Sequence, residues 1–209
     1  MRFTICALAA LALWGCAPKD VPFPDDTAPT TPATSTELTK SNPDAQRFTA
    51  LVLKETNKAR RAAGLSPLSA DGKLARAAQM QARNMARDRR MNHNTTARSE
   101  RTPQQRMDKV GLNGHFAENI AKNFVYDMRG KPVITRNEPQ CRLEFVGGGA
   151  VAAHSYESMA RTVVAQWMRS PGHRKNIMNP TYRRMGAGFQ PQTQAEFCGD
   201  VYLAQTFSN

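Results

Sequence analysis

The 209-residue chain is poor in three features that would each point to a particular class of protein: long apolar runs, cysteines and acidic residues. After the N-terminal segment, no apolar run approaches the roughly 20 residues that a membrane-spanning helix needs. Of the four cysteines, no two have the spacing of a zinc site. The 17 acidic residues face 29 Lys and Arg, so the net charge is +12. These absences leave one basic, soluble domain as the expectation.

The start of the chain has the three parts of a secretion signal. A charged Arg2 precedes an apolar run over residues 3 to 14, which is too short to cross a bilayer, and small Gly15 comes before Cys16. The run LWGC at residues 13 to 16 resembles the bacterial lipobox, which implies that Cys16 receives a lipid and becomes the new N-terminus. An ordinary signal peptide with an incidental cysteine is the alternative interpretation.

Export decides how the positive charge is interpreted. A basic balance often indicates nucleic acid, but outside the cytoplasm the anionic partners are lipid head groups and acidic cell-wall polymers. We therefore expect a membrane tether through Cys16, contact with anionic lipid or cell-wall polymer, and no nucleic acid. A role of the charge in solubility alone fits equally well. The residue after Cys16 is Ala17 rather than an aspartate. Under the sorting rule for bacterial lipoproteins, this favours the outer membrane, facing the periplasm or the cell surface.

The composition divides the chain into three parts. Residues 1–15 form the signal, and residues 16–42 begin with the lipidated cysteine and continue as a disordered tether rich in Pro and Thr. Residues 43–209 form one folded domain with an insertion at about 122–156. In an oxidising compartment, Cys141 and Cys198 are the pair left within this domain, and we expect them to form a disulfide.

Helical periodicity and terminal signals predict four helices. The first starts at Asn42-Pro43-Asp44 and stops at Gly64, and the second is capped by Ser69 and ends near Arg90. A short third helix is expected over 101–110, and a fourth over 157–169, where Trp167 faces the sheet and Ser170-Pro171-Gly172 ends the helix. The expected buried stripe of the second helix is Leu74, Ala77, Ala78, Gln81 and Met85.

Strand signals are concentrated in the second half of the chain. Residues 124–146 contain short β-prone pieces around turn residues, which indicate a hairpin insertion. Residues 185–190 and 200–207 alternate as two antiparallel strands. The predicted fold class is α+β, with helices on both faces of a small antiparallel sheet.

Five sequence motifs then occur in one order: NxxR from Asn57, GLSPLSADGKLARAAQMQARNMA followed by His93-Asn94, AENIA from residue 117, QWMxSPGHRxNIM from residue 166, and YxxQxF from Tyr202. Together they resemble the CAP superfamily, also called SCP-like, which covers cysteine-rich secretory proteins, antigen 5 and pathogenesis-related proteins. The match is nearest to its bacterial extracellular branch. The resemblance implies an α-β-α sandwich with a surface cleft.

The resemblance also implies which residues line the cleft. Carried over by motif, they are His93, His173 and Glu118, with Asn119 and Ser170 beside them. Eukaryotic members have a second glutamate where this chain has Ser170, a change that is common in the bacterial branch. A carboxylate pair for acid and base work is therefore incomplete.

Two imidazoles and one carboxylate suit two kinds of chemistry. His93, His173 and Glu118 could bind a divalent metal ion such as zinc, with an open fourth position. They could equally act as a general acid and base without metal. Ser170 is a poor nucleophile candidate, because no third orienting acid is evident and the motif is not a nucleophile elbow.

Each of these residues also has a structural interpretation. His93 and His173 could satisfy buried polar groups, and Glu118-Asn119 could brace a central loop. His115 lies three residues before Glu118 within reach of a metal site, but a solvent-facing loop position is the simpler interpretation, and His154 is expected in a loop. The basic run Arg83, Arg87, Arg89 and Arg90 fits a solvated helix face or a contact with anionic lipid or polymer.

The leading functional hypothesis is a lipid-anchored CAP-domain protein of the bacterial envelope that acts as a binding module. Its cleft would take a metal ion, a lipid or an envelope-derived ligand. One alternative is a metal-assisted hydrolase of peptide or cell-wall material, and another is a non-catalytic interaction protein with a vestigial cleft. One fold hosts such different roles, so the resemblance specifies the fold more closely than the activity.

Overall fold

A computed structural model describes residue 38 and residues 44–137, 142–193 and 199–209. The helices are α1 (Ala45–Ala62), α2 (Gly72–Asp88), α3 (Pro103–Lys109), α4 (Tyr156–Arg169) and α5 (Pro171–Ile177). The strands are β1 (Ser69–Ala70), β2 (Phe116–Phe124), β3 (Val133–Asn137), β4 (Arg142–Phe145), β5 (Arg184–Gln192) and β6 (Asp200–Ser208).

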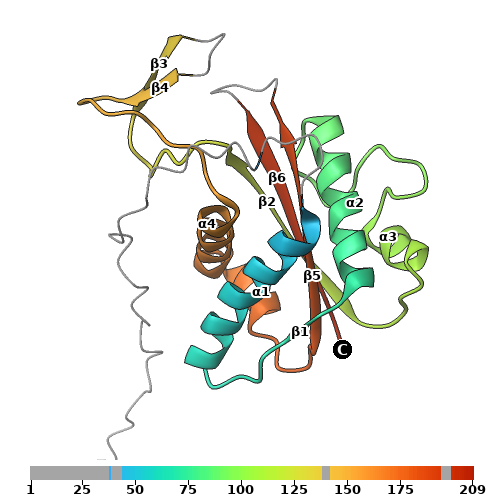
Figure 1. Ribbon diagram of the computed structural model, residues 1–209. Helices are drawn as coiled ribbons and strands as arrows, with labels where there is room; N and C mark the ends of the chain where they lie inside the picture. The colour runs from blue at the N-terminus through green and yellow to red at the C-terminus, as the bar shows by residue number, and fades with distance from the viewer. Residues whose placement is uncertain (1–37, 39–43, 138–141, 194–198) are drawn as a thin grey trace, which may run out of the picture.

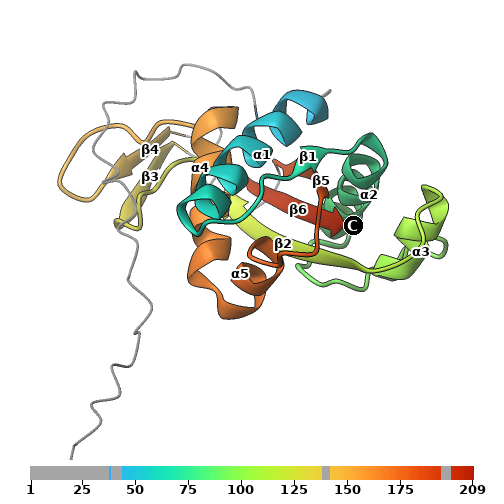
Figure 2. The ribbon, with the colours of Figure 1, turned by 90° about the horizontal axis from the view of Figure 1, so that it is seen from below.

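The elements form an α-β-α sandwich, which confirms the predicted fold class. Four strands make the central sheet in the order β1-β5-β6-β2, so that β2 lies at one edge. Helices α2 and α3 lie on one side of the sheet, and α1, α4 and α5 lie on the other (Figures 1 and 2). The expectation of a wholly antiparallel sheet was wrong in one respect, because the two-residue β1 pairs with β5 in parallel.

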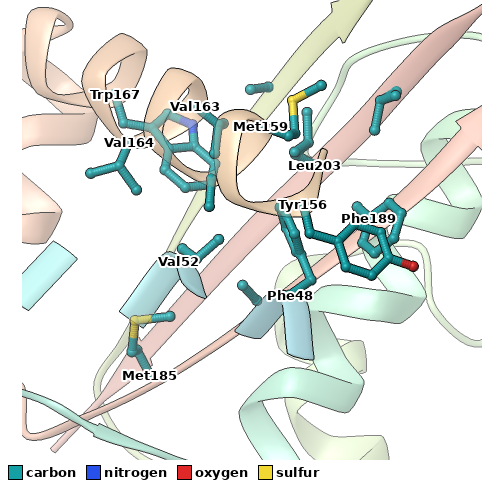
Figure 3. Packing of buried hydrophobic residues seen from close by; sticks show 14 of the residues in the cluster. Phe48, Val52, Tyr156, Met159, Val163, Val164, Trp167, Met185, Phe189 and Leu203 are labelled. Carbon is teal, nitrogen blue, oxygen red and sulfur yellow. The ribbon is translucent and has the colours of Figure 1, made fainter. Parts of the chain in front are cut away.

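The main hydrophobic core fills the layer between the sheet and the α1–α4 pair (Figure 3). Phe48 of α1 and Phe189 of β5 pack in a tilted arrangement with ring centroids 4.7 Å apart, and Tyr156 of α4 contacts the same Phe189 ring edge-on at 5.2 Å. Trp167 is fully buried here, and its indole N–H donates to the Ile120 carbonyl of β2 over 3.1 Å. The prediction that Trp167 faces the sheet is confirmed.

On the opposite side, α2 lies directly against the backbone of β5. A methyl group at Gly186 would lie 2.0 Å from the Ala75 amide nitrogen, and one at Gly188 would lie 2.5 Å from the Gln79 backbone. Only glycine allows so close an approach of helix and strand. The predicted stripe of α2 is buried as expected, at Leu74, Ala77, Ala78, Gln81 and Met85.

Both predicted helix caps were wrong by about two residues. The N-cap of α1 is Asp44, whose carboxylate accepts from the Arg47 amide at 2.9 Å, and the proposed cap Asn42 lies outside the described residues. The N-cap of α2 is Asp71 rather than Ser69. Ser69 is extended because it pairs with Arg184 of β5, a long-range contact that local capping rules do not include.

Two further elements differ from the sequence-based expectation. No strand was predicted over most of residues 116–124, where Glu118-Asn119 was expected to brace a loop, but these residues form the nine-residue strand β2. Pro171 does not end the helical region but starts α5 at its first position, where a missing N–H costs nothing. The hairpin predicted within the insertion is present as the separate β3–β4 sheet, away from the central sheet (Figure 1).

Several expectations concern residues that the structure does not describe. The lipidated Cys16, the rest of the tether before residue 38 and the Cys141–Cys198 disulfide lie outside the described residues. Leu38, expected in the disordered tether, is instead 1% exposed and packs in the main core. Within the described part, no helix is both long and apolar enough to cross a membrane.

The contact between α2 and β5 generates a stability prediction. We expect Gly186→Ala to lower the free energy of unfolding by about 2–3 kcal/mol, because the added methyl group must push apart two backbones. The control is Gly172→Ala in α5, where a methyl group meets nothing within 4 Å and alanine favours the helix. Urea denaturation measures both variants, and an equal effect of the two would contradict the close-packing argument.

Candidate functional site

The candidate residues meet at the edge strand β2. Side chains alternate along a strand, so neighbouring Glu118 and Asn119 point to opposite faces of the sheet. The contacts of Glu118 are with the α3 side, and those of Asn119 are with the α5 side. Among the described strands β2 is the last of the sheet, so residues from both faces can reach this edge.

On the α3 side, a buried ion pair fixes the Glu118 carboxylate. The Arg106 guanidinium, 1% exposed, donates from Nη2 to Oε1 and Oε2 of Glu118, both at 2.9 Å. His93 Nδ1 lies 2.8 Å from Glu118 Oε1. Both carboxylate oxygens are therefore engaged, while the His93 side chain is 47% exposed.

Arg106 also connects β2, which contains Glu118, to the segment between α2 and α3, which contains His93. Its Nη2 donates to the His93 carbonyl at 3.0 Å, and its Nη1 donates to the Glu100 carbonyl at 2.8 Å. The segment after α2 is held from its other side by Gln81, whose amide donates to the Asn92 carbonyl at 2.7 Å. The backbone of His93 is thus fixed between α2 and α3.

Arg106 was not predicted as a site residue, although a signal was present. Thr102 caps α3 in a capping box with Gln105, so the helix register is set by local sequence. In that register, Arg106 precedes buried Met107 and lies four residues before Val110, on the apolar side of a short helix. A charged residue on such a stripe requires a buried partner.

On the other face, an amide network joins β2 to α5. The Asn176 side chain donates to Asn119 Oδ1 at 2.8 Å, and the Asn119 side chain donates to the His173 carbonyl at 3.3 Å. Asn119 also donates to Gln205 Oε1 at 3.2 Å, and Gln205 donates to Thr56 of α1 at 2.9 Å. The position of His173 is thereby set by a fully buried asparagine.

His173 is half-buried in α5, whose contacts with Asn119 place it at the same edge strand as His93. Burial lowers the pKa of His173 below its usual value, and the charge of His93 lowers it further. His173 therefore favours the neutral imidazole, which can accept a hydrogen bond or bind a metal ion. The structure brings together four of the sequence-predicted residues: His93, Glu118, Asn119 and His173.

The position of Glu118 disfavours the three-ligand zinc site expected from the sequence. Its carboxylate is occupied by Arg106, and a buried cation beside a ligand oxygen opposes a second positive charge there. In the described part of the chain, no three His, Cys, Asp or Glu side chains are grouped as a metal site. Glu118 is placed to orient His93, and only the two imidazoles are left as candidate ligands.

The remaining candidates lie outside this arrangement or take structural positions. Ser170 joins α4 to α5 and makes no capping hydrogen bond with its side chain. His115 is exposed before β2, as expected. His154 does lie in a loop, but it is buried, with Nδ1 2.9 Å from Ser158 Oγ and Nε2 3.9 Å from Asp127 Oδ1.

The α-β-α sandwich, with a histidine and glutamate pair at its edge strand, defines a protein of the SCP type. The chain belongs to the CAP family, described as the cysteine-rich secretory protein family, whose model matches residues 53–207. The uncharacterized protein YkwD of Bacillus subtilis is 27% identical over 168 residues, which cover 78% of this chain and 52% of the relative. The chain thus spans about half the length of this curated relative.

Solved structures show the same fold at lower identity. An extracellular protein containing a SCP domain from Bacillus anthracis has a TM-score of 0.53 at 19% identity, covering 87% of this chain and 44% of that one. An outer surface protein from Borrelia burgdorferi has a TM-score of 0.52 at 17% identity, covering 79% of this chain and 96% of that one. These likenesses confirm the fold alone.

The buried ion pair generates a second prediction. Arg106→Met leaves the Glu118 carboxylate buried without its cation, so we expect the free energy of unfolding to fall by about 3–5 kcal/mol. Adding Glu118→Leu should recover part of this loss, because an apolar pair can replace a buried ion pair. Urea denaturation of both variants and of the exposed control Arg101→Met tests this, and a double variant less stable than Arg106→Met would refute it.

His154 generates a pH prediction. Burial lowers the pKa of this imidazole, and the nearby Asp127 carboxylate opposes that shift only in part. The unfolded chain, with a His pKa of about 6.5, then takes up a proton at a higher pH than the folded protein does. The contribution of His154 to stability is complete above about pH 7 and is lost as the pH falls toward the lowered, folded-state pKa.

We expect His154→Gln to lose less unfolding free energy than the wild type when the pH falls from about 7.5 to 5.5, because each pKa unit corresponds to about 1.4 kcal/mol. Thermal or urea denaturation at the two pH values measures the difference. The exposed His115→Gln variant should keep the wild-type dependence. Identical curves for His154→Gln and His115→Gln would show that His154 does not carry the effect.

Proposed function

We propose that the chain is an exported protein of the bacterial envelope, anchored through a lipid on Cys16, and that it acts as a binding module. The secretion signal and the LWGC run before and at Cys16 support export and anchoring. Among its structural neighbours, one is named an extracellular protein and another an outer surface protein. Membership of the CAP family supports the same location.

The contact between the Glu118 carboxylate and the His93 ring is the main observation that supports the proposed binding role. An ionised carboxylate only accepts hydrogen bonds, so the 2.8 Å contact assigns the proton on the His93 ring to Nδ1. In the neutral form of this exposed imidazole, the opposite nitrogen carries no proton and is an acceptor available to a ligand. A histidine oriented by a carboxylate in this way is the usual form of a metal-binding imidazole.

The ligand class that fits this pair is a divalent transition metal ion such as zinc, held by His93 and the neutral His173. Glu118 orients His93 from behind without binding the ion itself. When bound, the ion would supply a positive centre for a carbonyl or anionic group of an envelope-derived ligand. With only two protein ligands, coordination positions remain for that group.

Zinc titration by calorimetry tests this role. We expect one site in the full chain carrying Cys16→Ser, no measurable site in His93→Ala or His173→Ala, and a roughly 10- to 100-fold weaker site in Glu118→Gln, which loses the orienting charge. His115→Ala is the matched control, an exposed histidine that should bind as the parent does. Unchanged binding by the double variant His93→Ala, His173→Ala rejects the proposal.

A second candidate function rests on the same contact. A carboxylate that orients an imidazole is also the arrangement of a general base, which favours a hydrolase acting on peptide or cell-wall material. Turnover of a muropeptide mixture that disappears in Glu118→Gln would establish that activity. If the protein neither binds zinc nor turns over the muropeptides, it is instead an interaction protein with a vestigial site.

A further inference from the structure

The positive charge of the chain is concentrated in the stretch of sequence that contains α2 and α3. Residues 72–109 comprise α2, α3 and the segment between them, and they contain ten Lys and Arg against three Asp and Glu. This stretch therefore holds a net charge of +7 out of the +12 of the whole chain. We call the outer surface of α2 and α3 the α2–α3 face. It lies across the sheet from α1 and α4 (Figure 2).

Three exposed arginines form a ridge along α2. Arg76, Arg83 and Arg87 are seven and four residues apart, which places them on one side of the helix. At 1.5 Å per residue, the ridge is about 16 Å long. Met80 lies between its first two members and is 7% exposed, and the ridge therefore stands above an apolar base.

The ridge is only partly neutralised by neighbouring acids. Arg87 pairs with Asp88 at 2.8 Å, and Lys109 of α3 pairs with Glu100 at 2.5 Å. Among the described residues, no carboxylate lies within ion-pair distance of Arg76 or Arg83. Both guanidinium groups are exposed and make no hydrogen bond within the part of the chain that the structure describes, although Arg83 interacts electrostatically with Glu100, and such donors suit phosphate oxygens.

Two open hollows flank the ridge. One is lined by Arg83 and Arg87 together with residues 190–193 at the end of β5. The other is lined by Arg76, Arg83 and Lys109 around the apolar side chains of Met80 and Val110. Neither hollow is lined by His93, Glu118 or His173, so this surface is distinct from the candidate site.

We propose that the α2–α3 face is a docking surface for an anionic phospholipid bilayer. Cations on a convex ridge, with shallow hollows on both sides, fit a planar array of phosphate groups better than an enclosed ligand. The apolar side chains of Met80 and Val110 beneath the cations suit the boundary between head groups and acyl chains. This inference does not depend on ligand binding at His93 and His173.

Vesicle sedimentation tests the proposal with the full chain carrying Cys16→Ser, which cannot be lipidated. Vesicles contain phosphatidylcholine with or without 30% phosphatidylglycerol, a mole fraction of roughly one anionic lipid in three chosen to give a strong negative surface. We expect binding only to the anionic vesicles. Arg76→Gln, Arg83→Gln, Arg87→Gln together should weaken it roughly 100-fold, since each basic residue near the surface contributes about fivefold.

The chain offers a matched control on the opposite side of the sheet. Lys54, Lys58 and Arg61 are three exposed cations at helical spacing on α1, and neutralising them removes the same net charge. That variant should bind within about threefold of the parent if the α2–α3 face makes the contact. A triple arginine-to-lysine variant of the ridge should retain binding, and circular dichroism verifies that each variant is folded.

Three results would overturn the proposal. Equal weakening by the α1 and α2 variants would mean that net charge, not this face, attracts the membrane. Equal binding to vesicles without phosphatidylglycerol would assign the contact to apolar residues or to the N-terminal segment. Ridge-dependent binding to soluble polyphosphate, without binding to anionic vesicles, would identify a polymer as the partner.

Discussion

The close approach of α2 to β5 is the constraint on which the rest of the structure depends. Gly186 and Gly188 have no side chain, so the backbone of β5 approaches the backbone of α2 directly at these two positions. Gln79 then bonds the Phe189 backbone in both directions, donating to its carbonyl at 2.8 Å and accepting from its amide at 3.1 Å. A helix fixed in this way cannot slide or rotate against the sheet. The segment that follows its C-terminal end therefore places His93 at the edge of the sheet.

Burial of polar residues at that edge gives the site its rigidity. Glu118 and Asn119 occupy adjacent positions of β2 and are both buried, which is costly unless every polar group has a partner. Arg106 satisfies the carboxylate on one face, and Asn176 with Gln205 satisfies the amide on the other. These partners come from α3, α5 and β6, so the site forms only when both helical layers are in place. The resulting geometry holds one imidazole from each layer beside the edge strand.

Much of the fold was predictable because its signals are local. The buried stripe of α2, the two final strands and the hairpin in the insertion follow from periodicity that the side chains themselves impose. Expectations failed where a distant segment changed a local preference. Ser69 became a strand residue through its pairing with Arg184, and β2 was missed because its central Glu118 and Asn119 are polar but buried. Arg106 was missed because a charge pattern does not show which carboxylate a side chain will reach.

By itself, the sequence determined the α+β class, the positions of α1, α2, α3 and α4, the final two strands and the basic charge of residues 72–109, and its resemblance to a known family pointed to His93, Glu118 and His173. Those properties depend on residue type and on spacing within single elements. Only the tertiary structure decided that Glu118 is held by Arg106 and orients His93, and that the arginines of α2 form one surface across the sheet from α1. The physical reason is that both arrangements join segments far apart in the chain, and long-range pairing is set by packing around the glycines of β5.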